Sequence, residues 1–266
     1  MSDNVPAPSY GVELLYEAPP RLSSGDLLAA LRDRLGAAEA ADDPTALLFD
    51  FPDLADPSRE GGRPAGIAVE PTVDPLDEIE TAEALGGTRD WPGAEAAVRR
   101  HRARLIVVDR RASAIPYKNR IRIFRDGLQA VIGLGAPLAI YWKPAAKLVN
   151  PGLFGRPPRP GEKPDPLRDL VGLRLLPAPG GGASMILDTV GLSPLGLPDF
   201  ECPVGGADPS PTEPFLLSLA RYVFDLGDVI PDGRVVKGPD GKTRYACVRG
   251  RSSHPPDRAV LSLRPA

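Results

Sequence analysis

Cysteine and histidine are both scarce in this chain of 266 residues, with two of each. Cys202 and Cys247 are too few for a disulfide framework at this length, so reduced thiols are expected. His101 and His254 lie far apart in the sequence and have no neighbours of the ligand type. A metal site needs several convergent imidazoles, thiolates or carboxylates, so the sequence predicts no metal and no cofactor.

Long hydrophobic runs are also missing. No apolar run approaches the roughly 20 residues that cross a bilayer. The first ten residues carry two prolines and an aspartate, and they lack the basic and apolar regions of a signal peptide. These absences predict a cytoplasmic protein without membrane contact.

Charge is distributed unevenly along the chain, although the net charge is only −3. Residues 1–95 hold 6 basic and 20 acidic side chains, whereas residues 96–126 hold 10 basic and 2 acidic ones. The basic segment predicts a helix on which Lys118, Arg122 and Arg125 share one face. That face is either an ordinary solvated surface or a contact for an acidic partner.

Hydrophobic periodicity predicts an α+β fold with mixed, largely antiparallel sheets and about four helices. In the N-terminal half the elements follow the order β-α-β-β-α-β, which is the ferredoxin-like order. The predicted strands there are 12–16, 47–51, 66–69 and 105–108. The predicted helices are one between Ser23 and Gly36 and one from Pro92 to about Arg102.

The clearest helix begins at Pro116, and its apolar side chains fall on one stripe. That stripe comprises Tyr117, Ile121, Phe124, Leu128 and Val131. A strand at 138–142 follows. Further on, strands at 171–176, 185–187, 245–248 and 259–263 flank a helix at 212–226. We expect that helix to bury Phe215, Leu219, Tyr222 and Leu226.

These elements suggest two α+β lobes, at 10–150 and 168–266, which could also form one compact unit. Residues 1–9 are predicted to be a disordered tail. Residues 151–167 hold six prolines and are predicted to be a linker.

Two apparent catalytic motifs do not satisfy their own requirements. Gly241-Lys242-Thr243 would end a phosphate-binding loop only if a glycine stood at position 236, where the chain has Val236. Around Ser193, the second glycine of a nucleophile elbow comes one residue late. Pro194 also lacks the backbone N–H that an oxyanion hole uses. No catalytic residue is therefore predicted.

Two C-terminal stretches resemble a known family. Residues 187–202 read LDTVGLSPLGLPDFEC, and residues 221–233 read RYVFDLGDVIPDG. Together they are similar to the bacterial family called domain of unknown function 4261, over roughly residues 168–250. Pro203 departs from the pattern, which has a less rigid residue there. The resemblance implies no activity, because the family has none assigned.

The stretch from Asp188 to Cys202 is predicted to be an ordered loop that could form a binding surface. Four carboxylates could converge there, although each could equally cap a turn or a helix. They are Asp188, Asp199, Asp228 and Asp232.

Three hypotheses on function follow. The favoured one is a non-enzymatic module that binds another protein, like an adaptor or an immunity protein. The alternative is an enzyme or a small-molecule-binding protein that uses the 188–202 loop with Ser193. RNA binding by the basic helix is the weakest, because few aromatic side chains are available for stacking on bases.

Overall fold

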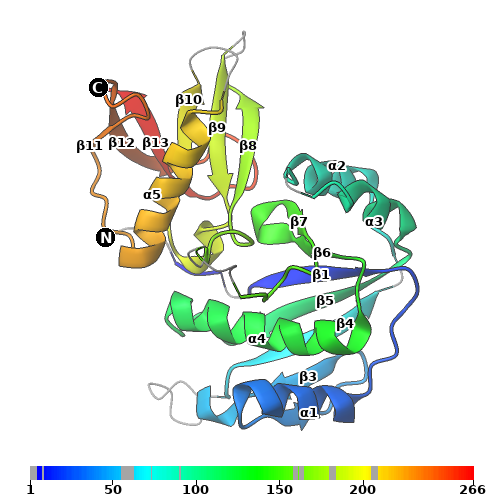
Figure 1. Cartoon of the computed structure of the whole chain (residues 1–266). Coiled ribbons are helices and arrows are strands. Elements are labelled where there is room, and N and C mark those ends of the chain that lie inside the picture. Colours follow the sequence, from blue (N-terminus) through cyan, green and yellow to red (C-terminus); the bar gives the residue numbers. More distant parts are fainter. Residues whose placement is uncertain are drawn as a thin grey trace. The chain divides into compact units, whose positions relative to one another are not determined.

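The computed structural model describes residues 5–7, 9–54, 63–72, 74–89, 91–157, 161, 165–179, 184–204 and 209–266. The chain forms two compact units (Figure 1). The N-terminal unit is Pro8–Asp165, and the C-terminal unit is Pro166–Ala266 together with Met1–Ala7. Within the predicted tail, the Ala7 N–H donates to the Pro194 carbonyl at 3.0 Å, and residues 1–4 lie outside the described residues.

The N-terminal unit is a seven-stranded antiparallel sheet in the order β2-β3-β4-β5-β1-β6-β7. Its strands are β1 Gly11–Tyr16, β2 Glu39–Ala41, β3 Leu47–Asp50, β4 Gly66–Thr72, β5 Ala103–Arg110, β6 Ala139–Trp142 and β7 Lys147–Val149. Its helices are α1 Ser24–Leu35, α2 Glu78–Gly86, α3 Ala94–Arg100 and α4 Tyr117–Gly135, with short 3₁₀ turns η1 Pro52–Leu54 and η2 Lys143–Ala145.

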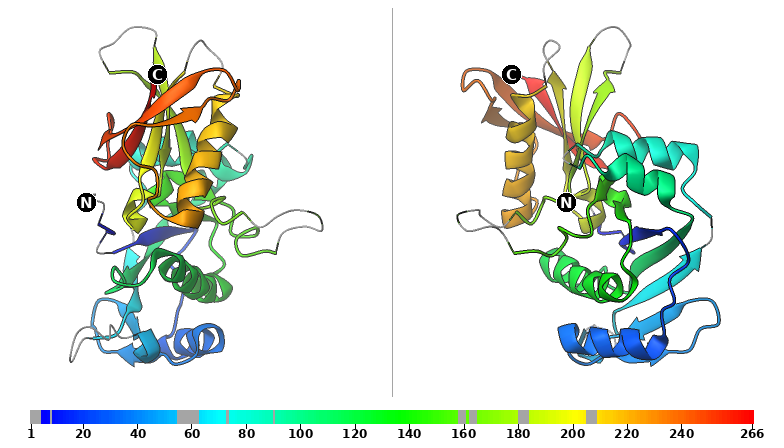
Figure 2. Two further views of the ribbon diagram at one scale, coloured as in Figure 1. Left: turned by 90° about the vertical axis from the view of Figure 1, so that its left-hand side faces the viewer. Right: turned by 45° about the vertical axis from the view of Figure 1, so that its right-hand side comes forward.

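Helices cover both faces of this sheet. α1 and α4 lie side by side in every view and contact one another (Figure 2). On the other face, Leu15 and Tyr141 pack with α2 and α3 in one apolar cluster. Along β5, buried residues alternate with half-buried ones, so one face of this strand is fully covered and the other is partly covered.

The predicted apolar stripe of α4 is confirmed from Ile121 to Val131 as buried, with Tyr117 half-buried. The ferredoxin-like order is not confirmed, because β2 and α2 are additional elements. Sequence periodicity missed β2 because it has only three residues, and it missed α2 because that helix buries Ala84 alone.

The C-terminal unit is a six-stranded sheet in the order β11-β12-β13-β10-β9-β8, antiparallel except for the parallel pair β10–β13. Its strands are β8 Gly172–Pro177, β9 Met185–Val190, β10 Asp199–Val204, β11 Arg234–Lys237, β12 Arg244–Arg251 and β13 Ala259–Pro265. The helix α5 Thr212–Leu226 packs on β9 and β10, and the 3₁₀ turn η3 is Ser193–Leu195.

Two predictions need correction in this unit. Most of the predicted loop at 188–202 is regular structure, because β10 occupies an interior position in the sheet. The buried face of α5 is Leu216, Ala220, Val223 and Phe224. Tyr222 and Leu226 instead face solvent, with 48% and 58% of their surfaces exposed.

The predicted linker is partly packed. Phe154 is buried, and its ring lies 5.7 Å from the Trp142 ring. Residues 158–160 and 162–164 lie outside the described residues.

None of the helices in the described ranges combines the length and the apolar character that crossing a membrane requires.

A buried aspartate–arginine cluster in the C-terminal unit

Two of the predicted carboxylates meet in the C-terminal unit. Asp188 on β9 and Asp199 at the start of β10 are both fully buried, and Arg258 beside β13 is 4% exposed. Arg258 Nη2 donates to Asp188 Oδ2 at 2.5 Å, and Arg258 Nε lies 3.4 Å from Asp199 Oδ2. With Arg174 of β8, these residues form what we call the Asp–Arg cluster.

Arg174 holds Asp188 from the other side. Its Nε and Nη2 donate to the two oxygens of Asp188 at 3.1 and 2.8 Å, which is a bidentate pair. Register explains the contact, because Arg174 and Asp188 are directly opposed on β8 and β9. Both carboxylate oxygens of Asp188 are therefore engaged by arginine.

Asp199 is held mainly by neutral donors. The backbone N–H groups of Leu192 and Ser193 donate to its two oxygens, each at 3.2 Å, and so does the Thr189 hydroxyl at 3.2 Å. Asp199 thus organises the 3₁₀ turn at Ser193.

Burial raises the pKa of Asp199 to about 6. The charge of Arg258 and the two backbone donors oppose this rise, while the nearby Asp188 carboxylate adds to it.

This pKa shift predicts a pH dependence. Asp199 binds its proton more tightly in the folded state than in the unfolded state, where its pKa is 3.8. Its contribution to stability is therefore full below about pH 4 and is lost as the pH rises through about 6. The loss is on the order of 3 kcal/mol. Carboxyl ¹³C NMR should give a midpoint near 6 for Asp199.

Asp199→Asn provides the comparison, because it removes this titration. The free energy of unfolding of the variant, relative to the unchanged protein, should rise between pH 4 and pH 7. A carboxyl midpoint below 4 would contradict the prediction.

The other two predicted carboxylates meet around a different arginine. Asp228 forms a bidentate pair with Arg249, with contacts at 2.9 and 2.5 Å. Asp232 accepts the backbone N–H of Arg249 at 2.8 Å. The structure therefore groups the four carboxylates as two arginine-centred pairs, Asp188 with Asp199 and Asp228 with Asp232.

Glu201 is a further buried carboxylate that sequence reasoning missed. It accepts the Ser253 N–H at 2.7 Å and the Ser253 hydroxyl at 2.9 Å, and the Ser262 hydroxyl lies at 3.3 Å. Together with Arg258, which donates to the carbonyls of His254 and Pro256, it fixes the segment between β12 and β13.

The predicted basic face in the N-terminal unit is only partly open. Lys118 and Arg122 on α4 are exposed, and Arg122 forms an ion pair with Asp126 at 3.4 Å. Arg125 is half-buried, with its guanidinium 4.7 Å from the centre of the Phe154 ring. Lys118 and Arg122 are therefore the members that a partner can reach.

The same helix contributes a charged group that the sequence did not point out. Arg120 is 1% exposed, and its Nε donates to Asp109 Oδ2 at 2.5 Å. An adjoining cavity lined by Phe51, Asp109, Arg120 and Phe124 has about 10 Å³ of space. That volume holds about one water molecule and not a metabolite.

Metal binding gains no support from the geometry. Among the residues that the structure describes, no three side chains of His, Cys, Asp or Glu are grouped so that they could hold a metal ion. His101 is buried and accepts the Leu76 N–H at 2.9 Å.

Comparison with known families places the Asp–Arg cluster in context. A family model described as Domain of unknown function (DUF4261) matches residues 188–264. The resemblance over 168–250 is thereby confirmed, with the match beginning at Asp188 and extending into β13. No curated protein and no solved structure matches the chain.

The DUF4261 match includes the second half of β9, all of α5 and most of β13. It also contains every residue of the Asp–Arg cluster except Arg174, which lies on the preceding strand. The cluster therefore links the DUF4261 segment to the strand that completes its sheet.

Proposed function

We propose that the chain is a non-enzymatic, cytoplasmic module that binds another protein through the outer surface of α5. The observation that carries this proposal is a second apolar stripe on that helix. Phe215, Leu219, Tyr222 and Leu226 follow one another at helical spacing, and we call them the outer stripe.

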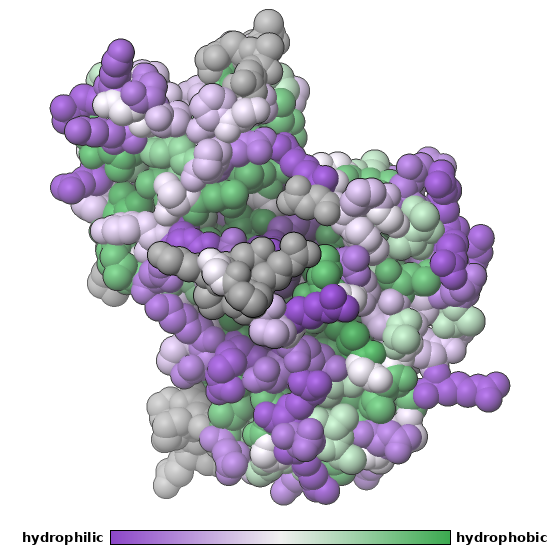
Figure 3. All heavy atoms as spheres, viewed as in Figure 1, coloured by the Kyte–Doolittle hydropathy of each residue, from purple (hydrophilic) through white to green (hydrophobic). Residues whose placement is uncertain are grey.

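A helix that packs on a sheet needs only one apolar stripe. In α5 the side chains of Leu216, Ala220 and Val223 already supply it. The outer stripe is only partly covered: Phe215 and Leu219 are half-buried, with the Phe215 ring next to that of Tyr245, whereas Tyr222 and Leu226 are exposed. Hydrophobic atoms lie at the surface over α5 in Figure 3.

The exposed apolar surface continues beyond the helix. Val229 is 48% exposed and follows Leu226 by three residues. Contiguous apolar patches on a folded surface commonly mark sites of protein association. Aromatic and aliphatic side chains such as Tyr222 and Leu226 also suit the centre of an interface.

The buried groups of the same unit support binding over catalysis. Arginine engages both oxygens of Asp188, and Asp199 is committed to Arg258 and to the turn at Ser193. A carboxylate that acts as an acid or a base must reach a proton on the substrate. The carboxylates of the 188–202 segment are thus engaged within the fold, whereas the apolar side chains at the end of α5 are open to a protein partner.

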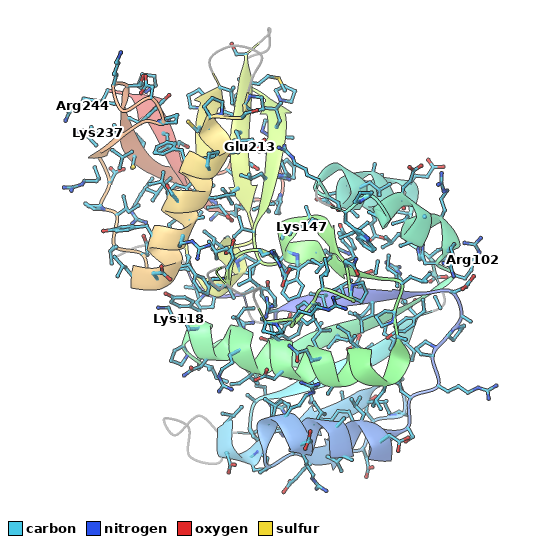
Figure 4. All side chains as sticks on the ribbon, viewed as in Figure 1. Arg102, Lys118, Lys147, Glu213, Lys237 and Arg244 are labelled. Atoms are coloured by element: carbon cyan, nitrogen blue, oxygen red, sulfur yellow. The ribbon has the colours of Figure 1, made fainter. Side chains whose placement is uncertain are left out.

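Lys118 and Arg122 are proposed as a second contact, for an acidic part of the partner. They project from the first turns of α4, where Figure 4 labels Lys118. Nucleic acid is the weaker candidate for that surface, because no exposed aromatic row accompanies the two charges.

Leu226→Asp tests the proposal. It places a charge in the middle of the proposed interface, so affinity for the partner should fall about thirtyfold or more. The partner is first isolated by affinity capture with and without nuclease, then purified, and its Kd is measured by titration calorimetry.

Leu217→Asp is the matched control, because Leu217 is an exposed leucine of α5 that lies off the outer stripe. It should leave the Kd within about threefold. A partner that binds both variants equally would refute the α5 interface. Sedimentation of the pure protein shows whether the partner is a second copy of the chain, since that association would depend on concentration and on Leu226.

A further inference from the structure

A second surface of the C-terminal unit carries positive charge without compensation. Residues 234–266 hold eight basic and two acidic side chains. Three of the basic side chains are tied to acidic partners, namely Arg249, Arg251 and Arg258. The other five form no ion pair with any acidic group among the described residues, and they are Arg234, Lys237, Lys242, Arg244 and Arg264.

Strand register brings three of these five together. Lys237 on β11 is directly opposite Arg244 on β12, as Figure 4 also shows. Ala246 of β12 is opposite both Val235 of β11 and Arg264 of β13. Because side chains alternate along a strand, these residues share one face of the sheet. We call Lys237, Arg244 and Arg264, with Val235 and Ala246 between them, the basic sheet face.

This face is the one that α5 leaves uncovered. Cys247 and Leu263, which point to the opposite side, are buried, and the Tyr245 ring lies 6.2 Å from Phe215 of α5. Lys237, Arg244 and Arg264 are all exposed. The basic sheet face is therefore separate from the outer stripe of α5.

The arrangement is unfavourable for the isolated fold. Like charges that are directly opposite on neighbouring strands destabilise the pairing. The nearest acid in the hairpin, Asp240, does not relieve it, because it accepts the N–H groups of Lys242 and Thr243 in the turn. The Thr243 hydroxyl also donates to Asp240. This hydrogen bond contributes most to holding the pKa of Asp240 below its ordinary value, and the two N–H groups add to the effect.

Protection of the sheet edge explains only part of this charge. A lysine on an edge strand discourages pairing with other chains, and Lys237 on β11 has that position. Arg244 and Arg264, however, lie on β12 and β13, which already have neighbours on both sides. A positively charged surface that extends over three strands indicates a binding site for an anionic partner.

We infer that the basic sheet face binds an acidic, extended protein segment with apolar side chains between its carboxylates. Carboxylates would meet Lys237, Arg244 and Arg264, while apolar side chains would meet Val235, which is 39% exposed, and Ala246. A nucleic acid fits less well, because Tyr245 faces α5 and no aromatic ring is available on this side for bases. This inference goes beyond the α5 interface and does not depend on it.

The test uses the full chain and two fluorescent peptides of equal length, one alternating glutamate with valine and one alternating lysine with valine. A single-stranded oligonucleotide of the same net charge as the acidic peptide is the third probe. Fluorescence anisotropy at 50 mM salt should give a Kd of about 100 µM or tighter for the acidic peptide. Higher salt should weaken this binding, because the contacts are between exposed charges.

Two charge-reversal variants on the same hairpin test whether the peptide binds at the basic sheet face. Arg244→Glu removes the central charge and should weaken binding about tenfold or more. Arg234→Glu makes the same change in charge on the opposite side of β11, and it should weaken binding by less than about threefold. Arg244→Glu should also keep or raise the melting temperature, since it converts the pair with Lys237 into one of opposite charges.

Equal effects of the two reversals, or no binding of the acidic peptide, would overturn the inference. Tighter binding of the oligonucleotide than of the acidic peptide would overturn it as well, and would assign the face to nucleic acid.

Discussion

Replacing Arg258 with methionine is expected to cost the C-terminal unit about 3–5 kcal/mol of its free energy of unfolding. Methionine keeps much of the aliphatic volume but removes the charge from a side chain that is 4% exposed. Asp188 then keeps only Arg174, and Asp199 loses its one cationic neighbour in the Asp–Arg cluster. Uncompensated buried charge is among the most destabilising changes a fold can receive.

Cysteine reactivity reports this change in the affected unit. Both cysteines of the chain, Cys202 and Cys247, are buried in the C-terminal unit. Burial raises the pKa of Cys202 to about 11, so its labelling at pH 8 depends on opening of the structure. Arg258→Met should therefore speed labelling strongly, and urea unfolding followed by circular dichroism should show the loss of stability.

Arg251→Met is the control, because Arg251 is largely exposed and pairs with Asp257 at the surface. It should change stability by less than about 0.5 kcal/mol. The defect of Arg258→Met should also shrink as the pH falls toward 4, since protonation neutralises Asp199, whose pKa burial raises to about 6. A defect that is small, or that does not vary with pH, would show that packing and not charge is the role of Arg258.

Periodicity predicted the long elements well because their burial follows a simple repeat. The predicted helix at 212–226 has the bounds observed for α5, and the stripe of α4 from Ile121 to Val131 is buried as expected. β10 was missed because Gly196, Pro198 and Pro203 suggested an irregular path. Its alternation of Phe200, Cys202 and Val204 with polar or proline positions is nevertheless that of a strand.

The error on α5 has a different cause. Periodicity finds an apolar stripe but cannot tell whether the fold or a partner covers it. In α5 both stripes exist, and the prediction chose Phe215, Leu219, Tyr222 and Leu226. The structure assigns the core to the adjacent stripe, which includes the small Ala220 and so has a weaker signal in the sequence.

The sequence pointed to the aspartates of the candidate site but not to its arginines. Asp188 and Asp199 stood out within motifs of glycine and proline, whereas Arg174 and Arg258 lie outside those motifs. Arg258 is 70 residues from Asp188 in the chain, so only the pairing of β13 with β10 and of β10 with β9 brings them together. One available signal was Arg174 itself, a charge between Leu173 and Leu175 in a predicted strand.

Arg120→Met is expected to have a comparable effect in the N-terminal unit, at about 3–5 kcal/mol. Arg120 neutralises Asp109, which is 5% exposed at the end of β5. Without the guanidinium, the carboxylate of Asp109 would keep the Tyr10 N–H, a donor at 2.6 Å, but no cation among the described residues would be in ion-pair contact with it.

Tryptophan fluorescence measures this unit alone. Both tryptophans of the chain, Trp91 and Trp142, belong to the N-terminal unit. Trp142 also donates a hydrogen bond to the hydroxyl of Tyr10 at 2.7 Å, next to the Asp109 contact. Urea titration of the emission should therefore show an earlier transition in Arg120→Met. Arg122→Met, an exposed neighbour on the same helix, should stay within about 0.5 kcal/mol of the unchanged protein.

A double variant separates charge from packing at this site. Asp109→Asn combined with Arg120→Met removes both charges but keeps an oxygen that can accept the Tyr10 N–H. Because the cost of the single variant comes from an unpaired buried charge, the double variant should recover more than about half of the lost stability. The double variant is compared with the sum of the stability losses of Asp109→Asn and Arg120→Met. If its loss equals that sum, Asp109 and Arg120 act independently, and the buried pair does not hold α4 to the end of β5.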